Sequence, residues 1–314
     1  MKWIIDTDPG IDDASAIITA INSGTLDILG ITAVHGNVGL EYTERNALKL
    51  VELMGADIPV YAGASRPILK KPENAAGFHG EDGSGNTFME RPSIQVEAEH
   101  AVDFLIRAAH ENEEISLLTL GPLTNLALAI CKDRTIEDRI SRIVMMAGTS
   151  RARGNTSAVA EFNVFADPEA AAVVFDTQIP ITMVPWETCL DTTFGPDTVA
   201  EIRKSLTPVG MAFARAMEFT LRGLKDATGE ELLVLCDLIA ACAAISPDVI
   251  TKKLSAKVRV ETCGIYSKGL TVIDERGVCA YEPNVTVCLE CDRDKIASMF
   301  LTAINHQKWT GVSS

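Results

Sequence analysis

Short apolar runs alternate with longer amphipathic stretches over residues 1–190 of the chain. The short runs are rich in β-branched residues and end at glycine, proline or acidic residues, which is typical of buried strands. They comprise Trp3–Thr7, Ile28–Val34, Ile115–Leu120, Arg142–Met146 and Ile179–Val184. In the longer stretches apolar residues repeat with the spacing of one helix face, at Asp12–Ser23, Tyr42–Met54, Ala98–Glu111, Leu123–Cys131 and Pro168–Phe175. This alternation predicts a doubly wound, mostly parallel central sheet with helices on both faces.

The C-terminal part of the chain departs from this alternation. Apolar runs at Leu254–Glu261, Thr271–Asp274 and Val285–Leu289 predict extra strands at a partly antiparallel edge of the sheet. Ile296–Ile304 predicts a closing C-terminal helix. Because no internal repeat or linker divides the sequence, we expect residues 1–314 to form a single α/β domain with a Rossmann-like sheet. Ligands of such sheets bind beyond the carboxyl ends of the strands.

Two segments interrupt the regular pattern. Residues 63–97 are rich in glycine and proline, and we expect them to form a flexible lid loop. The centre of this loop, residues 77–85, contains so much glycine that we expect it not to pack as a core element. Around Leu221–Glu231 the sequence predicts a second soft segment that separates two helices.

The excess of acidic over basic residues limits which molecules the chain can bind electrostatically. The 28 lysine and arginine residues are outnumbered by 43 acidic residues, which gives a net charge of −15. A chain this acidic is unsuited to nucleic acid or an anionic membrane as a bulk electrostatic partner. No run of about 18 apolar residues is available to cross a bilayer, and Asp6 stands where a signal peptide needs apolar residues. Eight scattered cysteines fit reduced thiols, so we expect a cytoplasmic protein.

Acidic residues crowd the turn after the first predicted strand. Asp6 and Asp8 end this strand, and Asp12 and Asp13 open the following helix. Carboxylates about 4 Å apart repel each other by on the order of 4 kcal/mol per pair at an effective dielectric constant near 20. Helix capping explains one or two acidic residues here, but not four. A hard cation such as Ca²⁺ or Mg²⁺ explains all of them, because it prefers oxygen ligands.

Two other classes of acidic metal site fit this turn less well. An EF-hand loop needs glycine at its sixth position and glutamate at its twelfth, where counting from Asp6 gives Ile11 and Ile17. A Mg²⁺-dependent phosphatase with an aspartyl nucleophile also has Asp-x-Asp at the end of its first strand. That likeness ends at Asp8, because Gly10 and further acidic residues follow it. The phosphatase is nevertheless an alternative on the sequence alone.

The complete acidic block resembles the signature of the inosine–uridine-preferring nucleoside hydrolase family. Further motifs match in family order as far as Asp237, and their order and spacing together are more specific than any one of them. These motifs are His35-Gly36-Asn37, Gly121–Ala127, Gly154–Ser157, Ala160–Asn163 and Asp167–Ala171. The resemblance implies the nucleoside hydrolase fold and hydrolysis of the N-glycosidic bond of ribonucleosides to ribose and a free base.

A metal centre is also implied by the resemblance. It consists of a Ca²⁺ ion held by the carboxylates of Asp8, Asp13 and Asp237 and by the main-chain carbonyl of Leu120. The ribose 2′- and 3′-hydroxyls and a water would complete a shell of about six to eight oxygens. The metal would lower the pKa of this water, and Asp8 would take its proton. The transition state of such a reaction resembles an oxocarbenium ion on the ribose.

The resemblance assigns further polar residues to the sugar. Asp12 would bind the ribose hydroxyls beside the metal, and Asn37 would bind the sugar or support Asp8. Asn155 and Glu161 would bind the 5′-hydroxyl end, and Asn163 would bind the 2′,3′ side. On residue type alone, without the surrounding motifs, turn and capping roles explain Asn155 and Asn163 better than sugar binding does. Polar groups matched to hydroxyls would reject a deoxy sugar, because buried groups left unpaired are costly.

The side that faces the leaving base is less defined. Family branches have histidine or tryptophan before the last metal aspartate, whereas Cys236 stands there, which resembles a third branch. Cys236 either donates a proton weakly or is a small buried residue. His79 matches a family histidine near the base. Trp186 either stacks on the base or packs internally, and Met146 either lines the sugar or belongs to the core.

Two points remain open on the sequence. A homologue that binds nucleosides but has lost turnover is compatible with Cys236 in place of the usual proton donor. The resemblance also implies a homodimer or homotetramer, since members of the family are commonly found as such assemblies. The partner expected in every case is a small ribonucleoside.

Overall fold

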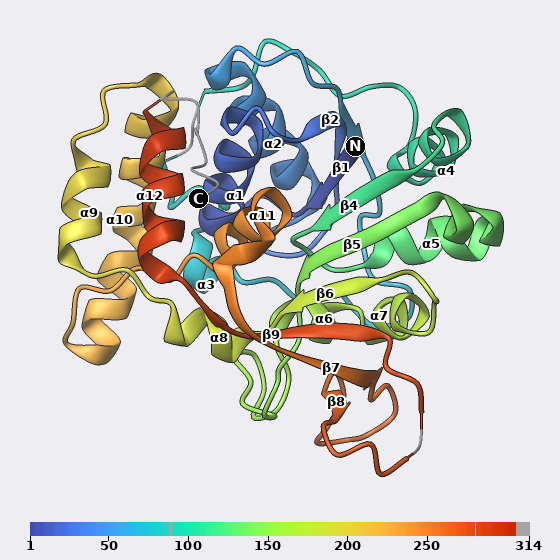
Figure 1. Cartoon of the computed structure of the whole chain (residues 1–314). Helices are drawn as coiled ribbons and strands as arrows, with labels where there is room; N and C mark the ends of the chain where they lie inside the picture. The colour runs from blue at the N-terminus through green and yellow to red at the C-terminus, as the bar shows by residue number, and fades with distance from the viewer. Residues whose placement is uncertain (88–89, 280, 306–314) are drawn as a thin grey trace.

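A mixed β-sheet forms the centre of the molecule. The computed structural model describes residues 1–87, 90–279 and 281–305, and within them the sheet has nine strands in the order β3-β2-β1-β4-β5-β6-β9-β7-β8 (Figure 1). The strands are β1 (Lys2–Thr7), β2 (Asp27–Ala33), β3 (Val60–Ala62), β4 (Ile115–Thr119), β5 (Ile140–Met146), β6 (Ile181–Val184), β7 (Ile250–Val260), β8 (Thr271–Asp274) and β9 (Val285–Cys291). All strands from β3 to β9 in this order are parallel, and β7 and β8 add an antiparallel edge. The predicted sheet is confirmed.

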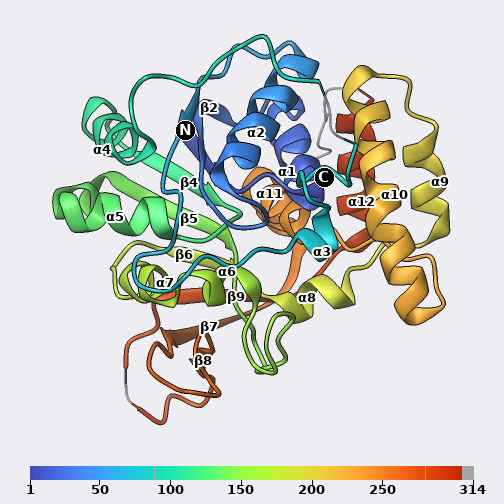
Figure 2. The ribbon, with the colours of Figure 1, turned by 180° about the vertical axis from the view of Figure 1, so that it is seen from behind.

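Helices cover both faces of the sheet. They are α1 (Ile11–Asn22), α2 (Leu40–Met54), α3 (Ala76–His79), α4 (Ala101–Glu111), α5 (Thr124–Lys132), α6 (Phe162–Ala166), α7 (Pro168–Phe175), α8 (Trp186–Asp191), α9 (Pro196–Arg203), α10 (Pro208–Thr228), α11 (Cys236–Ile245) and α12 (Arg293–Ile304), with 3₁₀ turns at Arg134–Arg139 and Pro247–Val249. Among the helices in the described ranges, none combines the length and the apolar character that crossing a bilayer requires. The chain therefore has the helix–sheet–helix layers of a single α/β domain, seen from behind in Figure 2.

Neighbouring residues of the central strand β1 pack on opposite faces of the sheet. Ile5 belongs to a buried cluster with α1, α2, α11 and α12, whereas Ile4 belongs to a second cluster with α4, α5 and α7. This follows from the alternation of side chains along a strand and explains why the buried strands read as continuous apolar runs. Strands β1, β4 and β5 are adjacent and parallel, so their carboxyl ends lie side by side. The loops that follow these strands therefore meet at the same end of the sheet.

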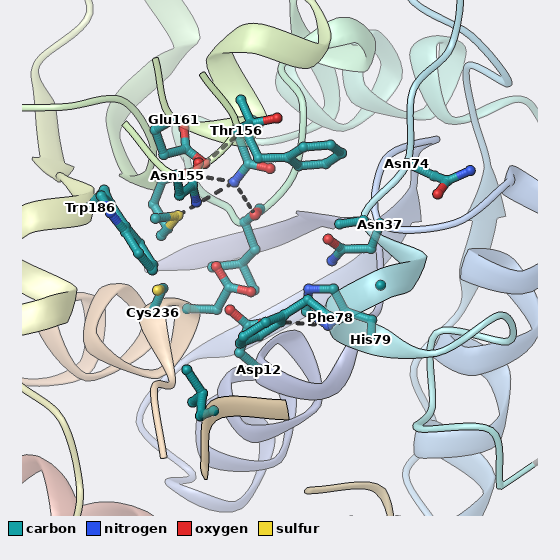
Figure 3. A pocket seen from close by; sticks show the side chains of 18 residues that line it. Asp12, Asn37, Asn74, Phe78, His79, Asn155, Thr156, Glu161, Trp186 and Cys236 are labelled. Atoms are coloured by element: carbon teal, nitrogen blue, oxygen red, sulfur yellow. Dashed lines mark hydrogen bonds and ion pairs between the residues drawn. The ribbon is translucent and has the colours of Figure 1, made fainter. Parts of the chain in front are cut away.

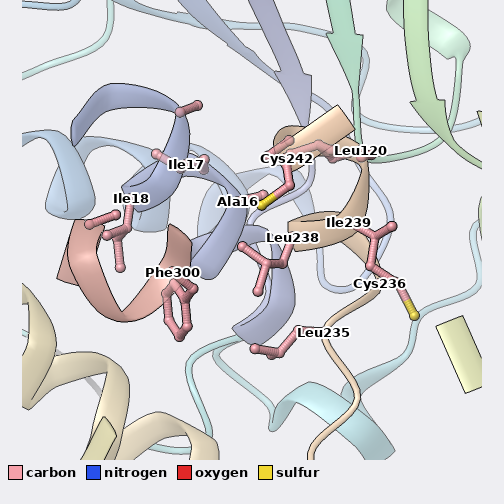
Figure 4. Close-up of a cluster of buried hydrophobic side chains, with 14 of the residues drawn as sticks. Ala16, Ile17, Ile18, Leu120, Leu235, Cys236, Leu238, Ile239, Cys242 and Phe300 are labelled. Carbon is pink, nitrogen blue, oxygen red and sulfur yellow. The ribbon is translucent and has the colours of Figure 1, made fainter. Parts of the chain in front are cut away.

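Helix α11 is buried along nearly its whole length. Figure 4 shows its side chains Leu238 and Ile239 in one apolar cluster with Ala16 of α1 and Phe300 of α12. A helix that is apolar all round must be covered on every side, and each large side chain removed from water contributes about 1.5–3 kcal/mol. The packing fixes the first turn of α11, which carries Asp237, beside the first turn of α1.

Two expectations about loops are wrong. Helix α10 continues through residues 221–228, where the sequence predicts a soft segment, and ends at Gly229 with a φ of 79°. Residues 77–85 do pack, because His79 and Asp82 are buried and Asn46 of α2 donates a hydrogen bond of 2.8 Å to the carbonyl of Asp82. Residues 88–89 of the expected lid lie outside the described residues. That residues 63–97 act as a lid stays a prediction.

Asp6 belongs to the scaffold of the sheet. Its Oδ1 accepts hydrogen bonds from Thr32 Oγ1 at 2.6 Å and from Asn125 Nδ2 at 2.8 Å. The same Asn125 amide donates to the carbonyl of Ala33 at 3.1 Å and accepts from the main-chain N–H of Ala64 at 2.8 Å. Asn125 therefore links β1, β2 and the chain after β3 where the loops of the site begin.

Replacing Asn125 with alanine should destabilise the fold strongly. The change removes the hydrogen bonds between Asn125 and three other groups, the Asp6 carboxylate, the Ala33 carbonyl and the Ala64 N–H, so we expect the free energy of unfolding in urea to fall by about 3 kcal/mol. Asn112→Ala is the matched control, because its side chain is only partly buried and donates one bond, to the carbonyl of Ala108. We expect this control to cost about 1 kcal/mol or less. Equal losses for the two variants would contradict the bridging role of Asn125.

Candidate functional site

Three carboxylates converge where the first turns of α1 and α11 meet. Asp12 and Asp13 lie in the first turn of α1, and Asp237 lies in the first turn of α11. Each offers a carboxylate oxygen, and these oxygens lie within 4.8 Å of one another. Asp8, which follows β1 directly, is fully buried nearby, and the charges of Asp12 and Asp13 act on it. The group of three thus includes Asp12, which the sequence assigns to the sugar, beside the expected ligands.

The residues of this cluster fit a cation. Oδ1 of Asp8, of Asp12 and of Asp237 is buried and has no hydrogen-bond partner among the described residues. Burial, followed by the charges of neighbouring aspartates, raises the pKa of Asp8 and of Asp237 well above the ordinary carboxyl value. Burial also raises the pKa of Asp12 to about 6. Unpaired carboxylate oxygens that are this hard to ionise are compensated by a bound positive charge, and an all-oxygen donor set suits a hard divalent ion.

Asp13 is oriented by three hydrogen bonds. Thr7 Oγ1 donates to Oδ1 at 2.5 Å, and the N–H of Gly10 and Nδ2 of Asn37 donate to Oδ2, both at 2.9 Å. These donors come from the end of β1, the turn after it and the loop after β2. These three elements together therefore fix the orientation of the Asp13 side chain.

Two glycines allow the backbone to approach the Asp8 carboxylate. A Cβ atom at Gly36 would lie 1.9 Å from Oδ2 of Asp8, and one at Gly121 would lie 2.4 Å from Oδ1. The N–H of Asn37 donates to Oδ2 of Asp8 at 2.7 Å. Any side chain at either glycine would displace the carboxylate, so the motifs after β2 and β4 hold Asp8 in place.

A cavity of about 500 Å³ opens above the cluster, a size suited to a small organic molecule (Figure 3). Eleven of the residues singled out in the sequence line it: Asp12, Asn37, His79, Leu120, Met146, Asn155, Glu161, Asn163, Trp186, Cys236 and Asp237. Asp8 and Asp13 are fully buried and do not line it. Asn155, Thr156 and Glu161 lie at one end of the cavity, and Asp12 and His79 lie at the other.

The amide of Asn163 connects two strand ends of the site. Its Nδ2 donates to the carbonyl of Leu120 at 2.7 Å and to the carbonyl of Met146 at 3.0 Å. The carbonyl of Leu120 keeps a second lone pair, so it remains available as a metal ligand. The Met146 sulfur lies 3.5 Å from the same amide nitrogen, and Met146 both lines the cavity and belongs to the core.

Glu161 holds the chain around the start of α6. Its carboxylate accepts hydrogen bonds from the N–H groups of Gly148 and Asn163, both at 2.7 Å, and from that of Val164 at 3.3 Å. Burial raises the pKa of Glu161 to about 7, although these donors favour the charged form. Glu161 is therefore positioned to face a polar group of a ligand and to orient Asn163.

Apolar and weakly polar side chains form the remaining wall. Trp186 and Cys236 lie together on one side of the cavity, and Phe78 lies across it (Figure 3). Hydrogen bonding with Cys189 and burial raise the pKa of the Cys236 thiol well above its ordinary value. The thiol therefore stays protonated, and Cys236 is a weak hydrogen-bond donor and no thiolate nucleophile.

His79 contacts the first turn of α1. Its Nδ1 accepts a hydrogen bond of 3.1 Å from the N–H of Ile11 and lies 3.7 Å from Oδ1 of Asp12. Burial lowers the pKa of His79 to about 4, against the opposing charge of Asp13. The ring is therefore neutral near pH 7 and carries its proton on Nε2, which can donate a hydrogen bond but is not an imidazolium acid.

Sequence reasoning missed several lining residues: Asn74, Ala75, Gly77, Phe78, Thr156, Phe162 and Leu224. Thr156 and Phe162 belong to the family motifs Gly154–Ser157 and Ala160–Asn163, so their place in these motifs could have indicated that they line the cavity. Leu224 comes from the part of α10 that the sequence predicts to be soft. Phe78 comes from the segment that was expected not to pack, so no local pattern pointed to it.

The phosphatase alternative does not fit the geometry. Asp6, the first aspartate of Asp-x-Asp, has its Oδ1 occupied by Thr32 and Asn125 and does not line the cavity. A nucleophilic carboxylate has to face the substrate.

Comparison with known proteins agrees with the site. The model of a family described as inosine-uridine preferring nucleoside hydrolase matches residues 3–298. The chain is 36% identical over 295 residues to the pyrimidine-specific ribonucleoside hydrolase RihB of Escherichia coli, covering 93% of each chain. A plant nucleoside hydrolase, PpNRh1, superimposes with a TM-score of 0.91 at 32% identity, covering 97% of this chain and 98% of that one. A purine-preferring ribonucleoside hydrolase from Gardnerella vaginalis superimposes with a TM-score of 0.90 at 29% identity, covering 97% and 98%.

The family match spans nearly the whole chain, and the compared proteins are nucleoside hydrolases by name, two of them ribonucleoside hydrolases. The acidic cluster, the cavity above it and this match point to one reaction, the hydrolysis of the N-glycosidic bond of a ribonucleoside. The chain belongs to the inosine-uridine preferring nucleoside hydrolase family.

Proposed function

We propose that this enzyme is a Ca²⁺-dependent ribonucleoside hydrolase with its metal site at Asp8, Asp13, Asp237 and the carbonyl of Leu120. The observation that carries the proposal is the set of buried, unpartnered carboxylate oxygens at the floor of the cavity. Ca²⁺ accepts six to eight oxygen ligands in flexible geometry, which suits four protein groups supplemented by a sugar diol and water. Asp12 lines the cavity beside the cluster, which supports a role between the cluster and the sugar.

The protein residues in this proposal bind the ribose and deprotonate the attacking water. A bound divalent ion would lower the pKa of that water and orient the sugar diol. Asp8 takes the proton, because its Oδ1 has no other partner among the described residues while Asn37 fixes its Oδ2. Asp12 and Asn163 bind the 2′- and 3′-hydroxyls, and Asn155 and Glu161 bind the 5′-hydroxyl. The hydroxyl-matched groups would reject a 2′-deoxy sugar.

The leaving base in this proposal lies between Trp186 and Phe78. Aromatic side chains of this kind stack on either class of base, so the wall by itself favours neither purines nor pyrimidines. One compared relative is pyrimidine-specific by name and another is purine-preferring, so both classes are candidate substrates. The protonated thiol of Cys236 and Nε2–H of His79 are the groups that would hydrogen-bond the departing base.

We also propose that the protein works in the cytoplasm as a homodimer or homotetramer. The eight cysteines are all free thiols, which supports a reducing compartment. The assembly is proposed from the resemblance to the family alone.

Replacing Asp8 with asparagine should remove most of the activity and keep the fold. Asparagine has the same shape but cannot take a proton from water, so we expect kcat for ribose release from inosine and uridine to fall by about 10²- to 10⁴-fold. Asp6→Asn is the matched control, because the bonds from Thr32 and Asn125 both go to one oxygen that asparagine retains. This control should keep kcat within about threefold. Wild-type protein that binds nucleosides without releasing ribose would instead identify a homologue that lacks turnover.

Without divalent ions, the folded protein should become less stable as the pH rises. The pKa is raised to about 6 for Asp6 and Asp12 and to about 7 for Glu161, so the ion-free folded protein holds more protons than the unfolded chain. Its stability should therefore fall as pH rises from about 4 to about 7. Burial also raises the pKa values of the proposed ligands Asp8, Asp13 and Asp237, and Ca²⁺ favours their charged forms, so the gain in Tm on adding it should grow as pH rises. Melting curves with EDTA and with Ca²⁺ test this, and a gain independent of pH would contradict it.

A further inference from the structure

The loop between β5 and α6 carries Asn155, which the sequence assigns to the 5′-hydroxyl end of the ribose. Asn155 and Thr156 line the cavity, yet both are exposed, as are residues 151–153 of the same loop, which spans residues 148–160. It extends beside α8 in Figure 1. A binding loop of this kind needs an anchor, because an unanchored loop loses entropy when it binds.

A buried carboxylate next to the cavity supplies such an anchor. Glu187, in the first turn of α8, accepts bonds at Oε2 from the N–H of Ser150 at 2.6 Å and from its hydroxyl at 3.1 Å. Its Oε1 accepts from the N–H of Arg151 at 2.7 Å and from the N–H of Arg153 at 3.2 Å. Glu187 is buried and does not line the cavity. Four donors from three neighbouring loop residues thus converge on one side chain.

The backbone between these donors is strained. Ala152 has a φ of 56°, a conformation that costs a residue with a Cβ atom roughly 1–2 kcal/mol. Arg151 and Arg153 stand on either side of it and donate to the same oxygen of Glu187. The strained turn is therefore what brings both N–H groups to the carboxylate, and charge-assisted bonds are strong enough to offset its cost.

The other side of the loop base is held separately. Thr271, the first residue of β8, accepts a bond at Oγ1 from the N–H of Thr149 at 2.8 Å and donates to the carbonyl of Thr149 at 2.6 Å. The sheet edge thus fixes residue 149, and Glu187 fixes residues 150–153. Asn155 and Thr156 follow the part that Glu187 holds after one intervening residue, Gly154.

We propose that Glu187 is a positioning residue that holds the loop 148–160 so that its Asn155–Thr156 segment can bind the 5′-hydroxyl of the substrate. The proposal rests on the function proposed above for this site. Glu187 acts only through the loop, so its effect is coupled to the presence of a 5′-hydroxyl on the substrate. A residue that merely stabilised the fold would affect all substrates alike.

A variant crossed with a modified substrate tests this coupling. Glu187→Gln keeps the shape but replaces one acceptor oxygen with an NH₂ group, so at least one loop N–H loses its partner. We expect kcat/KM for inosine to fall by about 10- to 100-fold, and for 5′-deoxyinosine by no more than about threefold. Asp191→Asn removes a charge from the same helix at an exposed position and should leave both values unchanged. Equal losses on both substrates, or no loss on inosine, would overturn the proposal.

Limited proteolysis supplies a readout that does not need activity. Arg151 and Arg153 are exposed tryptic sites inside the anchored part of the loop. In Glu187→Gln, trypsin should cut after these residues about tenfold faster, with cleavage elsewhere unchanged. Unchanged cleavage there would overturn the anchoring role. If the wild-type protein releases no ribose from either substrate while the variant loop is cut faster, the proposed function fails and the anchoring of the loop stands.

Discussion

The requirement to neutralise buried carboxylates governs this molecule. Asp8, Asp13 and Asp237 are fully or almost fully buried, and Asp12 lies beside them at the cavity floor. Isolated charges of one sign cannot remain ionised at such a place, since burial and mutual repulsion both raise their pKa values. Without a cation the fold has to keep protons on these groups, which opposes their use as bases. A divalent ion bound at these carboxylates would remove this conflict, because it favours their charged forms.

The scaffold is built to hold that cluster in one arrangement. Hydrogen bonds from Thr7, Gly10 and Asn37 fix the carboxylate of Asp13, and the missing side chains of Gly36 and Gly121 leave room for Asp8. The apolar packing of α11 brings in Asp237 from more than two hundred residues away in the sequence. These supports come from different elements, so the geometry of the carboxylate cluster depends on all the loops at the carboxyl ends of the strands and on α11 being in place.

Local sequence patterns predicted the parts of the structure that local physics controls. The alternation of short apolar runs with amphipathic stretches predicted the parallel sheet. The acidic turn and the motifs that accompany it pointed to most of the residues that line the cavity. The order of residues 77–85 could not be predicted, because it depends on partners such as Asn46 and the N–H of Ile11 that are distant in sequence. Glu187 carries no motif because its partners are mainly main-chain N–H groups, which nearly any residue supplies.

The most direct test of this account is an electron-density map of crystals grown with Ca²⁺ and a ribose-containing ligand. The account predicts one ion bound by oxygens of Asp8, Asp13 and Asp237 and by the carbonyl of Leu120, with the sugar diol completing its shell. It would be contradicted by a map in which this position is empty at saturating Ca²⁺ and the carboxylates hydrogen-bond to one another as protonated acids.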